Sequence, residues 1–124
     1  MSTKTILYVE DNEFNRKIVR NLLAGTSYRL IEATDGEQGV AMALQEMPNL
    51  ILMDIQLPKL SGLEATRKLR ADPKTAHIPI IAVTSFALSG DDQKAKEAGA
   101  SAYLAKPYSP RELLQMIRKF APED

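Results

Sequence analysis

Five short apolar runs alternate with five stretches of helical periodicity, and this alternation restricts the fold more than any other feature of the chain. Most of these runs are rich in β-branched residues or wholly apolar, and a segment with apolar residues at helical spacing follows each of them. The predicted strands are Thr5–Val9, Tyr28–Ala33, Leu50–Met53, Ile80–Thr84 and Ala102–Leu104. Because strands that alternate with helices pair in parallel, the pattern predicts an α/β fold.

Capping residues mark the ends of the predicted helices. Two capping boxes, Ser61–Glu64 and Ser109–Glu112, place a serine and a glutamate where each satisfies a free backbone amide of the other. The other boundary residues are Asn12 and Gly25 for the first helix, Asp35 and Pro48 for the second, and Ser89 and Gly99 for the fourth. The side chains predicted to face the core are Ile18, Val19, Leu22 and Leu23 in the first helix and Val40, Ala43 and Leu44 in the second.

The composition of the strands indicates the layers of the fold. Leu50–Met53 and Ile80–Val83 are apolar on both faces, which is typical of central parallel strands covered by helices on both sides. The second strand carries Arg29 and Glu32, which we expect to face outward at a sheet edge. With 124 residues the chain has the usual size of one domain. We therefore expect a single domain over residues 1–124, a three-layer (βα)₅ sandwich without a separate output domain.

Charge and cysteine content exclude several classes of function. The chain has 16 Lys and Arg against 16 Asp and Glu, so it has no general attraction to nucleic acid or to an anionic membrane. It contains no cysteine, which excludes disulfides, thiolate metal sites and cysteine catalysis. Met1–Leu7 does not resemble a signal peptide, and the longest apolar run is far too short to cross a bilayer. We expect a cytoplasmic protein that binds neither nucleic acid nor membrane.

Polar side chains follow four of the predicted strands. Glu10 and Asp11 follow the first strand, Asp54 follows the third, Thr84 ends the fourth and Lys106 follows the fifth. Each alone has an ordinary explanation, because acidic pairs and lone lysines are usually solvated surface residues. Ligands of an open parallel sheet, however, bind outside the carboxyl ends of its strands, where these groups are expected to meet. Clustered carboxylates suit Mg²⁺, and a lysine and a hydroxyl suit an anion, so the set predicts a phosphoryl-transfer site.

Several segments match one known family in their order and spacing. They are Val9–Asn12, Met53–Pro58, Gly62, Val83–Ser85 and Lys106–Pro107. In these segments the chain resembles bacterial response-regulator receiver domains, the CheY-like family, from end to end. The resemblance implies a flavodoxin-like sheet with strand order 2-1-3-4-5. Glu10 departs from the family pattern, because many receivers have aspartate at this position.

The resemblance also implies a role for each polar residue of the predicted site. Asp54 would accept the phosphoryl group, while Lys106 and the Thr84 hydroxyl would contact its oxygens. The implied protein ligands of Mg²⁺ are Asp11, Asp54 and the backbone carbonyl of Gln56, with Glu10 bound through water. Tyr103 would swing inward as Thr84 moves and alter the face formed by the fourth helix, fifth strand and fifth helix (the α4-β5-α5 face). Lys106–Pro107 would be joined by a cis peptide bond.

Three further segments, Glu10–Asn15, Leu52–Pro58 and His77–Pro79, are similar to the DivK-type single-domain regulators of phosphorelays. This similarity implies a sensor histidine kinase or histidine phosphotransferase as phosphodonor, a downstream protein target, and the option of a homodimer. The residues expected to contact a partner are Phe14, Asn15, Ile18 and Pro107. Phe14 has the alternative explanation of a side chain folded back on its own helix, and His77 is expected to be an ordinary surface residue.

Two enzyme classes and one binding class compete with this interpretation. A flavodoxin needs a Ser/Thr/Gly phosphate loop after the first strand, and a phosphatase of the haloacid-dehalogenase type needs Asp-x-Asp there. Glu10–Asn12 supplies neither sequence. A degenerate receiver that acts as an unphosphorylated scaffold is the remaining alternative, and the complete set of Asp54, Thr84 and Lys106 argues against it. We expect no catalysis beyond the domain's own phosphorylation and dephosphorylation.

Overall fold

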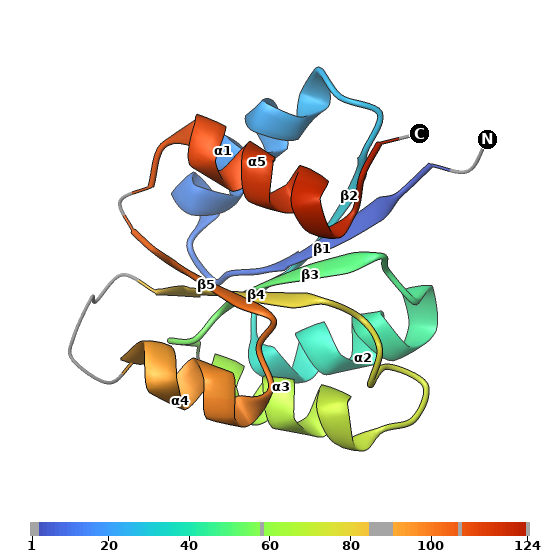
Figure 1. Ribbon diagram of the computed structural model, residues 1–124, viewed down its shortest axis with the longest axis vertical. Coiled ribbons are helices and arrows are strands. Elements are labelled where there is room, and N and C mark those ends of the chain that lie inside the picture. The colour runs from blue at the N-terminus through green and yellow to red at the C-terminus, as the bar shows by residue number, and fades with distance from the viewer. Residues whose placement is uncertain (1–2, 58, 85–90, 107, 124) are drawn as a thin grey trace.

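The computed structural model describes residues 3–57, 59–84, 91–106 and 108–123, and over these it has the predicted alternation of strands and helices (Figure 1). The strands are β1 (Thr5–Val9), β2 (Arg29–Ala33), β3 (Leu50–Asp54), β4 (Ile80–Thr84) and β5 (Ala102–Ala105). They pair in parallel in the order β2-β1-β3-β4-β5. The predicted fold class, the strand order and the edge position of the second strand are therefore confirmed.

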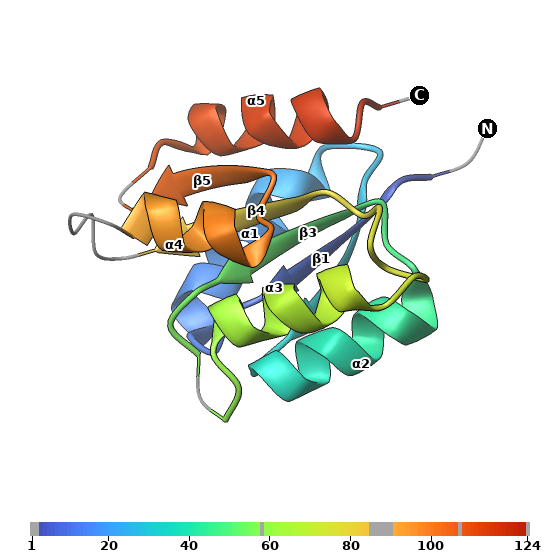
Figure 2. The ribbon, with the colours of Figure 1, turned by 60° about the horizontal axis from the view of Figure 1, so that its bottom comes forward.

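The helices form two layers, one on each face of the sheet. They are α1 (Glu13–Ala24), α2 (Gly36–Glu46), α3 (Gly62–Ala71), α4 (Asp91–Ala98) and α5 (Pro110–Phe120). In two views, α1 and α5 lie on one face, and α2, α3 and α4 lie on the other (Figure 1, Figure 2). Among the described residues, no helix combines the length and the apolar character that a membrane span requires.

The two larger of three apolar clusters fill most of the space between the sheet and its helices. One includes Tyr8 and Leu52 from the sheet with Val19 of α1, and the other includes Met53 from the sheet with Leu69 of α3. Every residue of β3 and β4 is buried, as expected for central parallel strands. Burial of apolar surface stabilises the folded state by about 25 cal/mol per Å². The packing of these clusters therefore holds in place the strands whose ends carry the polar residues.

Two helix positions that we predicted to face the core are exposed. Ile18 of α1 is 40% exposed and Leu44 of α2 is 36% exposed. In α1 the face that is buried against the sheet is narrower than predicted. It includes Val19, whereas Ile18 lies beside it. In α2 the small residues Gly39 and Ala43 face the sheet instead, and a Cβ at Gly39 would lie 2.8 Å from Val9. The helix thus packs close to β1 and turns Leu44 toward solvent.

We expected Arg29 and Glu32 of the edge strand both to face outward. They lie instead on opposite faces of the sheet. Side chains alternate along a strand, so positions 29 and 32 must point in opposite directions. Arg29 pairs with Glu46 of α2 at 3.3 Å, whereas Glu32 pairs with Arg20 of α1 at 2.7 Å. Each residue therefore links the edge strand to a different helix layer.

The predicted helix caps are largely present. Asn12 and Asp35 accept backbone hydrogen bonds at the starts of α1 and α2, and the box at Ser109–Glu112 is complete. At α3, Ser61 accepts from the Glu64 amide, but the Glu64 carboxylate pairs with Arg67 at 2.6 Å instead of closing the box. Gly99 follows α4 with a φ of 109°, a conformation that favours glycine. Ser89, Pro58, Ser85 and Pro107, and with it the expected cis peptide, lie outside the described residues.

Arg70 of α3 contacts two loops, the one before β4 and the one before β5, a role that the sequence did not indicate. Its guanidinium donates hydrogen bonds to the carbonyl oxygens of Gly99, Ala76 and Ile78 at 2.7, 3.0 and 2.5 Å, and to the Ser101 hydroxyl at 3.1 Å. The rigid fork of arginine suits several acceptors at once. This side chain therefore ties α3 to the connections that precede β4 and β5.

Gly62 allows α3 to begin directly against the backbone of β3. A Cβ at this position would lie 2.0 Å from the carbonyl oxygen of Asp54 and 2.5 Å from the Cα of Ile55. Both are backbone atoms, which cannot move aside as a flexible side chain can. Glycine is therefore required here by close approach, and not by an unusual φ.

We predict that Gly62→Ala destabilises the protein by about 2–4 kcal/mol, because the added methyl group must displace the chain that carries Asp54. Gly25→Ala is the matched control, since a Cβ there meets nothing within 4 Å and its φ of −90° suits alanine. The control should change stability by less than about 1 kcal/mol. Urea denaturation measures both values, and equal effects would contradict the packing described here.

Candidate metal centre

The predicted site residues meet at one edge of the sheet because the strands that carry them run in parallel. Glu10 and Asp11 follow β1, Asp54 ends β3, Thr84 ends β4 and Lys106 follows β5. The register sets Asp54 opposite Val83, and the Lys106 amide donates to the Thr84 carbonyl at 2.6 Å. The structure thus brings the strand ends that carry all five residues to one edge of the sheet, and it brings the side chains of Glu10, Asp11, Asp54 and Lys106 together.

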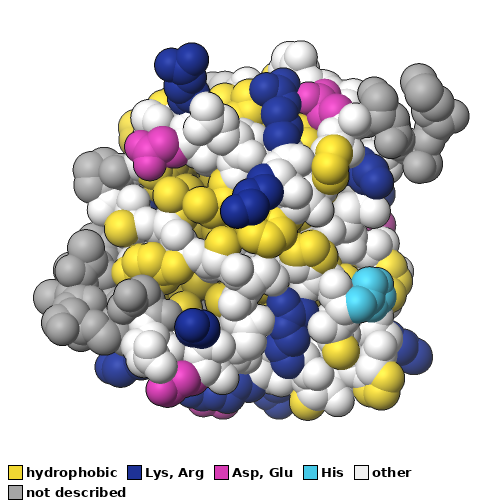
Figure 3. All heavy atoms as spheres, in the orientation of Figure 1, with side chains coloured by type: hydrophobic (Ala, Val, Ile, Leu, Met, Phe, Trp, Pro, Cys, Tyr) yellow, Lys and Arg dark blue, Asp and Glu magenta, His cyan; other side chains and the backbone are white. Residues whose placement is uncertain are grey.

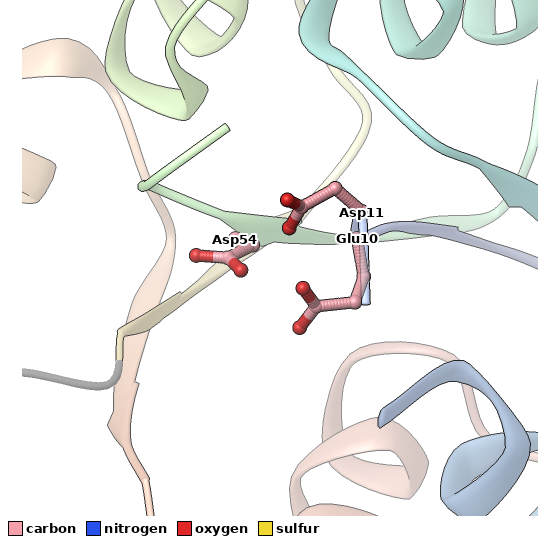
Figure 4. A group of neighbouring side chains, drawn as sticks. All are labelled: Glu10, Asp11 and Asp54. Carbon is pink, nitrogen blue, oxygen red and sulfur yellow. The ribbon is translucent and has the colours of Figure 1, made fainter. Parts of the chain in front are cut away.

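Three carboxylates converge at the centre of this edge. One oxygen from each of Glu10, Asp11 and Asp54 lies within 4.8 Å of the others (Figure 4). Glu10 and Asp54 are only 1% and 4% exposed, whereas Asp11 is exposed to solvent. Like charges this close repel unless a proton or a cation joins them. An all-oxygen ligand set open to water on one side suits Mg²⁺, which keeps several waters when it binds.

Lys106 supplies a positive charge beside the carboxylates. Its Nζ lies 2.5 Å from Oε1 of Glu10 and 3.7 Å from Oδ2 of Asp54. Burial lowers the pKa of this lysine, but the hydrogen bond to Glu10 and the charges of both carboxylates outweigh it, so the pKa is raised overall. Lys106 therefore stays charged, with Glu10 as its close partner and Asp54 within reach.

Glu10 is held by donors from β1, α1 and the end of β5. Its Oε1 accepts from Lys106, from the Tyr8 hydroxyl at 3.1 Å and from Nδ2 of Asn15 at 3.3 Å, and its Oε2 accepts from the Asn12 amide at 3.3 Å. Burial alone raises the pKa of Glu10, but hydrogen bonds from Asp54 and Lys106 reverse the shift and lower it. Glu10 is therefore the ionised member of the buried pair.

Asp54 carries the opposite shift. Burial raises its pKa most, and the hydrogen bond to Glu10 adds to this effect, while the Gln56 amide, which donates to Oδ1 at 2.9 Å, lowers it. The net result is a pKa of about 7. In the absence of a cation, Asp54 and Glu10 thus share one proton, and Asp54 holds it up to about neutral pH.

The other predicted residues differ in how far they are buried. Thr84 is fully buried and Tyr103 is half-buried in β5. Gln56 is exposed on the loop after β3, next to the carboxylate that its amide contacts. Phe14 is 70% exposed, which contradicts the explanation that it folds back on its own helix. Asn15 is half-buried because its amide contacts Glu10.

Sequence reasoning missed several residues of the site, among them Tyr8 and Arg16. The sequence pattern marks Tyr8 only as part of an apolar strand, but its hydroxyl donates a hydrogen bond to Glu10. Arg16 donates to the Glu10 carbonyl at 2.9 Å and pairs with Glu13 at 2.5 Å, so it fixes the turn between β1 and α1. A tyrosine two residues before an acidic pair lies on the same face of a strand as the first acid, and this spacing could have identified Tyr8.

Comparison with known proteins identifies the family. The model of the response regulator receiver domain matches residues 6–118. The chain belongs to this family. This receiver domain is 42% identical over 118 residues to the polar-differentiation response regulator DivK of Brucella ovis, which spans 95% of this chain and 96% of that protein. The resemblance stated from the sequence is therefore confirmed.

Solved receiver structures share the fold closely. The receiver domain of a sensor histidine kinase from Pseudomonas aeruginosa PAO1 is 39% identical with a TM-score of 0.88, covering 96% of this chain and 98% of that one. That domain has a magnesium ion coordinated in its active-site cleft. The chemotaxis protein CheY4 of Vibrio cholerae is 26% identical with a TM-score of 0.89, covering 96% and 99%. The expected Mg²⁺ agrees with this relative and with the convergent carboxylates of this receiver.

The raised pKa of Asp54 predicts how the stability of the metal-free receiver depends on pH. An unfolded aspartate ionises near pH 3.8, whereas folded Asp54 ionises at about 7. Folding takes up a proton between these values, so the stability contributed by this group falls as pH rises through this range and levels off above it. We expect wild type in EDTA to lose about 1–3 kcal/mol from pH 5 to 7.5 relative to Asp54→Asn, by urea denaturation. Parallel pH profiles of the two proteins would show that the pKa is not raised.

Proposed function

We propose that this receiver domain is the phosphorylation switch of a two-component system or phosphorelay, with Asp54 as phosphoacceptor and Mg²⁺ as cofactor. The observation that carries the proposal is the convergence of three carboxylates within 4.8 Å, with the Lys106 ammonium 3.7 Å from Asp54. A buried acid beside a lysine and open to a cation is equipped for phosphoryl transfer, because that chemistry depends on position and charge. The Mg²⁺ bound by a similar receiver supports the choice of metal.

The proposed transfer needs little beyond this arrangement. A carboxylate oxygen of Asp54 attacks the phosphorus of a phosphohistidine, and a P–O bond forms as the P–N bond breaks and the histidine leaves with the electron pair. The residues that would hold Mg²⁺ are Asp11, Asp54 and the Gln56 carbonyl, with Glu10 acting through water, and the bound ion would supply positive charge to the carboxylates and the phosphoryl oxygens. Lys106 contacts one phosphoryl oxygen and the Thr84 hydroxyl another. The domain promotes only its own phosphorylation and dephosphorylation.

Output is proposed to pass through the α4-β5-α5 face. Apolar side chains gather on the molecular surface over β5, between α4 and α5 (Figure 3). A groove on this face is lined by Leu104, Glu112, Gln115, Met116 and Lys119. A phosphoryl group that draws in Thr84 would change the packing of Tyr103 on the neighbouring strand β5. A downstream protein, or a second copy of the chain, would read this change by contact.

The phosphodonor is proposed to dock on α1. Phe14 and Ile18 are four residues apart, so they share one helix face, and they are 70% and 40% exposed. Their neighbour Asn15 contacts Glu10, which places this apolar pair beside the metal centre. A sensor histidine kinase or histidine phosphotransferase that covered these side chains would bring its phosphohistidine to Asp54. We propose that this occurs in the cytoplasm, without nucleic acid or membrane as partner.

Intact mass spectrometry tests the proposed chemistry. With Mg²⁺ and acetyl phosphate, wild type should gain one phosphoryl group that hydroxylamine removes, and Asp54→Asn or excess EDTA should abolish the adduct. A wild type that stays unmodified under these conditions would favour the alternative, a receiver that acts as an unphosphorylated scaffold. An adduct that survives in Asp54→Asn would place the acceptor elsewhere.

Phosphotransfer rates test the docking surface separately. For any phosphorylated histidine kinase or phosphotransferase that phosphorylates wild type, Phe14→Ala should slow transfer about five- to thirtyfold, because a buried aromatic anchor is worth on the order of 1–2 kcal/mol. The rate at which acetyl phosphate phosphorylates Phe14→Ala should equal that of wild type. Met47→Ala is the matched control, since Met47 is also apolar and 42% exposed but lies at the end of α2. If the phosphorylated partner transfers its phosphoryl group to Phe14→Ala as fast as to Met47→Ala, α1 is not the docking surface.

A further inference from the structure

We propose that Tyr8 is a positioning residue of the phosphorylation site, which holds the Glu10 carboxylate while Lys106 moves from it to the phosphoryl group. The inference rests on the proposed function and deepens it. Tyr8 is fully buried in β1, and its hydroxyl donates to Oε1 of Glu10 at 3.1 Å. The ring packs in the apolar cluster under α1 and α5, which fixes the position of the hydroxyl.

Three donors share one oxygen of Glu10. Oε1 accepts from Lys106 at 2.5 Å, from Tyr8 at 3.1 Å and from Asn15 at 3.3 Å. These donors compete, because a carboxylate oxygen has two lone pairs. Glu10 is 1% exposed, so bulk water does not readily replace a donor that leaves. The strength of the contact between Lys106 and Glu10 therefore depends on whether the Tyr8 hydroxyl is present.

Lys106 must weaken its contact with Glu10 to act at Asp54. Its Nζ is 2.5 Å from Glu10 but 3.7 Å from Asp54, which is beyond a hydrogen bond. Removing a charged partner from a buried carboxylate is costly unless other donors remain. The Tyr8 hydroxyl is such a donor, and the core holds it in place. It lowers the cost of moving Lys106 toward the phosphoryl oxygens.

The test is Tyr8→Phe, which removes only the hydroxyl. We expect the rate of phosphorylation by acetyl phosphate at saturating Mg²⁺ to fall about three- to tenfold, because Lys106 remains on Glu10. Mg²⁺ affinity, followed by titration without a phosphodonor, should stay the same or rise, because Glu10 keeps its charge and loses a competing donor. A general disturbance of the site would weaken Mg²⁺ binding and slow phosphorylation together, and that result would overturn the inference.

Two further variants make the test specific. Tyr28→Phe makes the same chemical change in the same apolar cluster, where the hydroxyl donates to the Ala121 carbonyl away from the site, and it should leave the phosphorylation rate unchanged. In a Glu10→Gln background, Tyr8→Phe should alter the rate less than about twofold, because the acceptor charge through which it acts is gone. An undiminished effect in that background would show that Tyr8 does not act through Glu10.

The failure of this inference is distinguishable from the failure of the proposed function. If wild type takes no phosphoryl group, the proposed function fails and the inference fails with it. If wild type is phosphorylated and Tyr8→Phe is phosphorylated equally fast, the function stands and only the role of Tyr8 is overturned.

Discussion

The short ion pair between Glu10 and Lys106 is the interaction on which the rest of the site depends. The two residues are 96 positions apart in the sequence, yet Nζ and Oε1 lie 2.5 Å apart. The side chains are 1% and 14% exposed, so neither charge could lose its partner without a large cost. Because β1 and β5 are separated in the sheet by β3 and β4, the pair spans the end of the sheet and lies beside Asp54, between them.

The same arrangement makes the metal-free site electrostatically unfavourable. Burial and a neighbouring carboxylate raise the pKa of Asp54 to about 7, which shows that its charged form is poorly stabilised by the protein alone. The proposed phosphoryl transfer requires that charge, because only the ionised carboxylate is a nucleophile. A bound cation would stabilise the ionised form of Asp54 in spite of its burial. The apolar packing of β3 and β4 holds the strand ends in place despite the repulsion.

Much of this structure was predictable from the sequence. Strand bounds agreed within one residue at each end, because β-branched runs and capping residues are local signals, and the strand order followed from the family resemblance. Errors arose where a choice depended on tertiary packing. Leu44 faces solvent because Gly39 and Ala43 let α2 approach the sheet, and Glu64 pairs with Arg67 instead of its cap. Arg70 acts through tertiary contacts that no local pattern reveals, whereas the spacing of Tyr8 from Glu10 is a local signal that could have identified its role.

The most direct test of the central claim is a crystal structure of the protein with Mg²⁺ and beryllofluoride, a stable analogue of the phosphoryl group. The account predicts beryllium bonded to a carboxylate oxygen of Asp54, Mg²⁺ bound by Asp11 and Asp54, and Lys106 Nζ moved from Glu10 to a fluorine. Beryllofluoride elsewhere, or bound to Asp54 while Lys106 keeps its 2.5 Å contact with Glu10, would contradict the account.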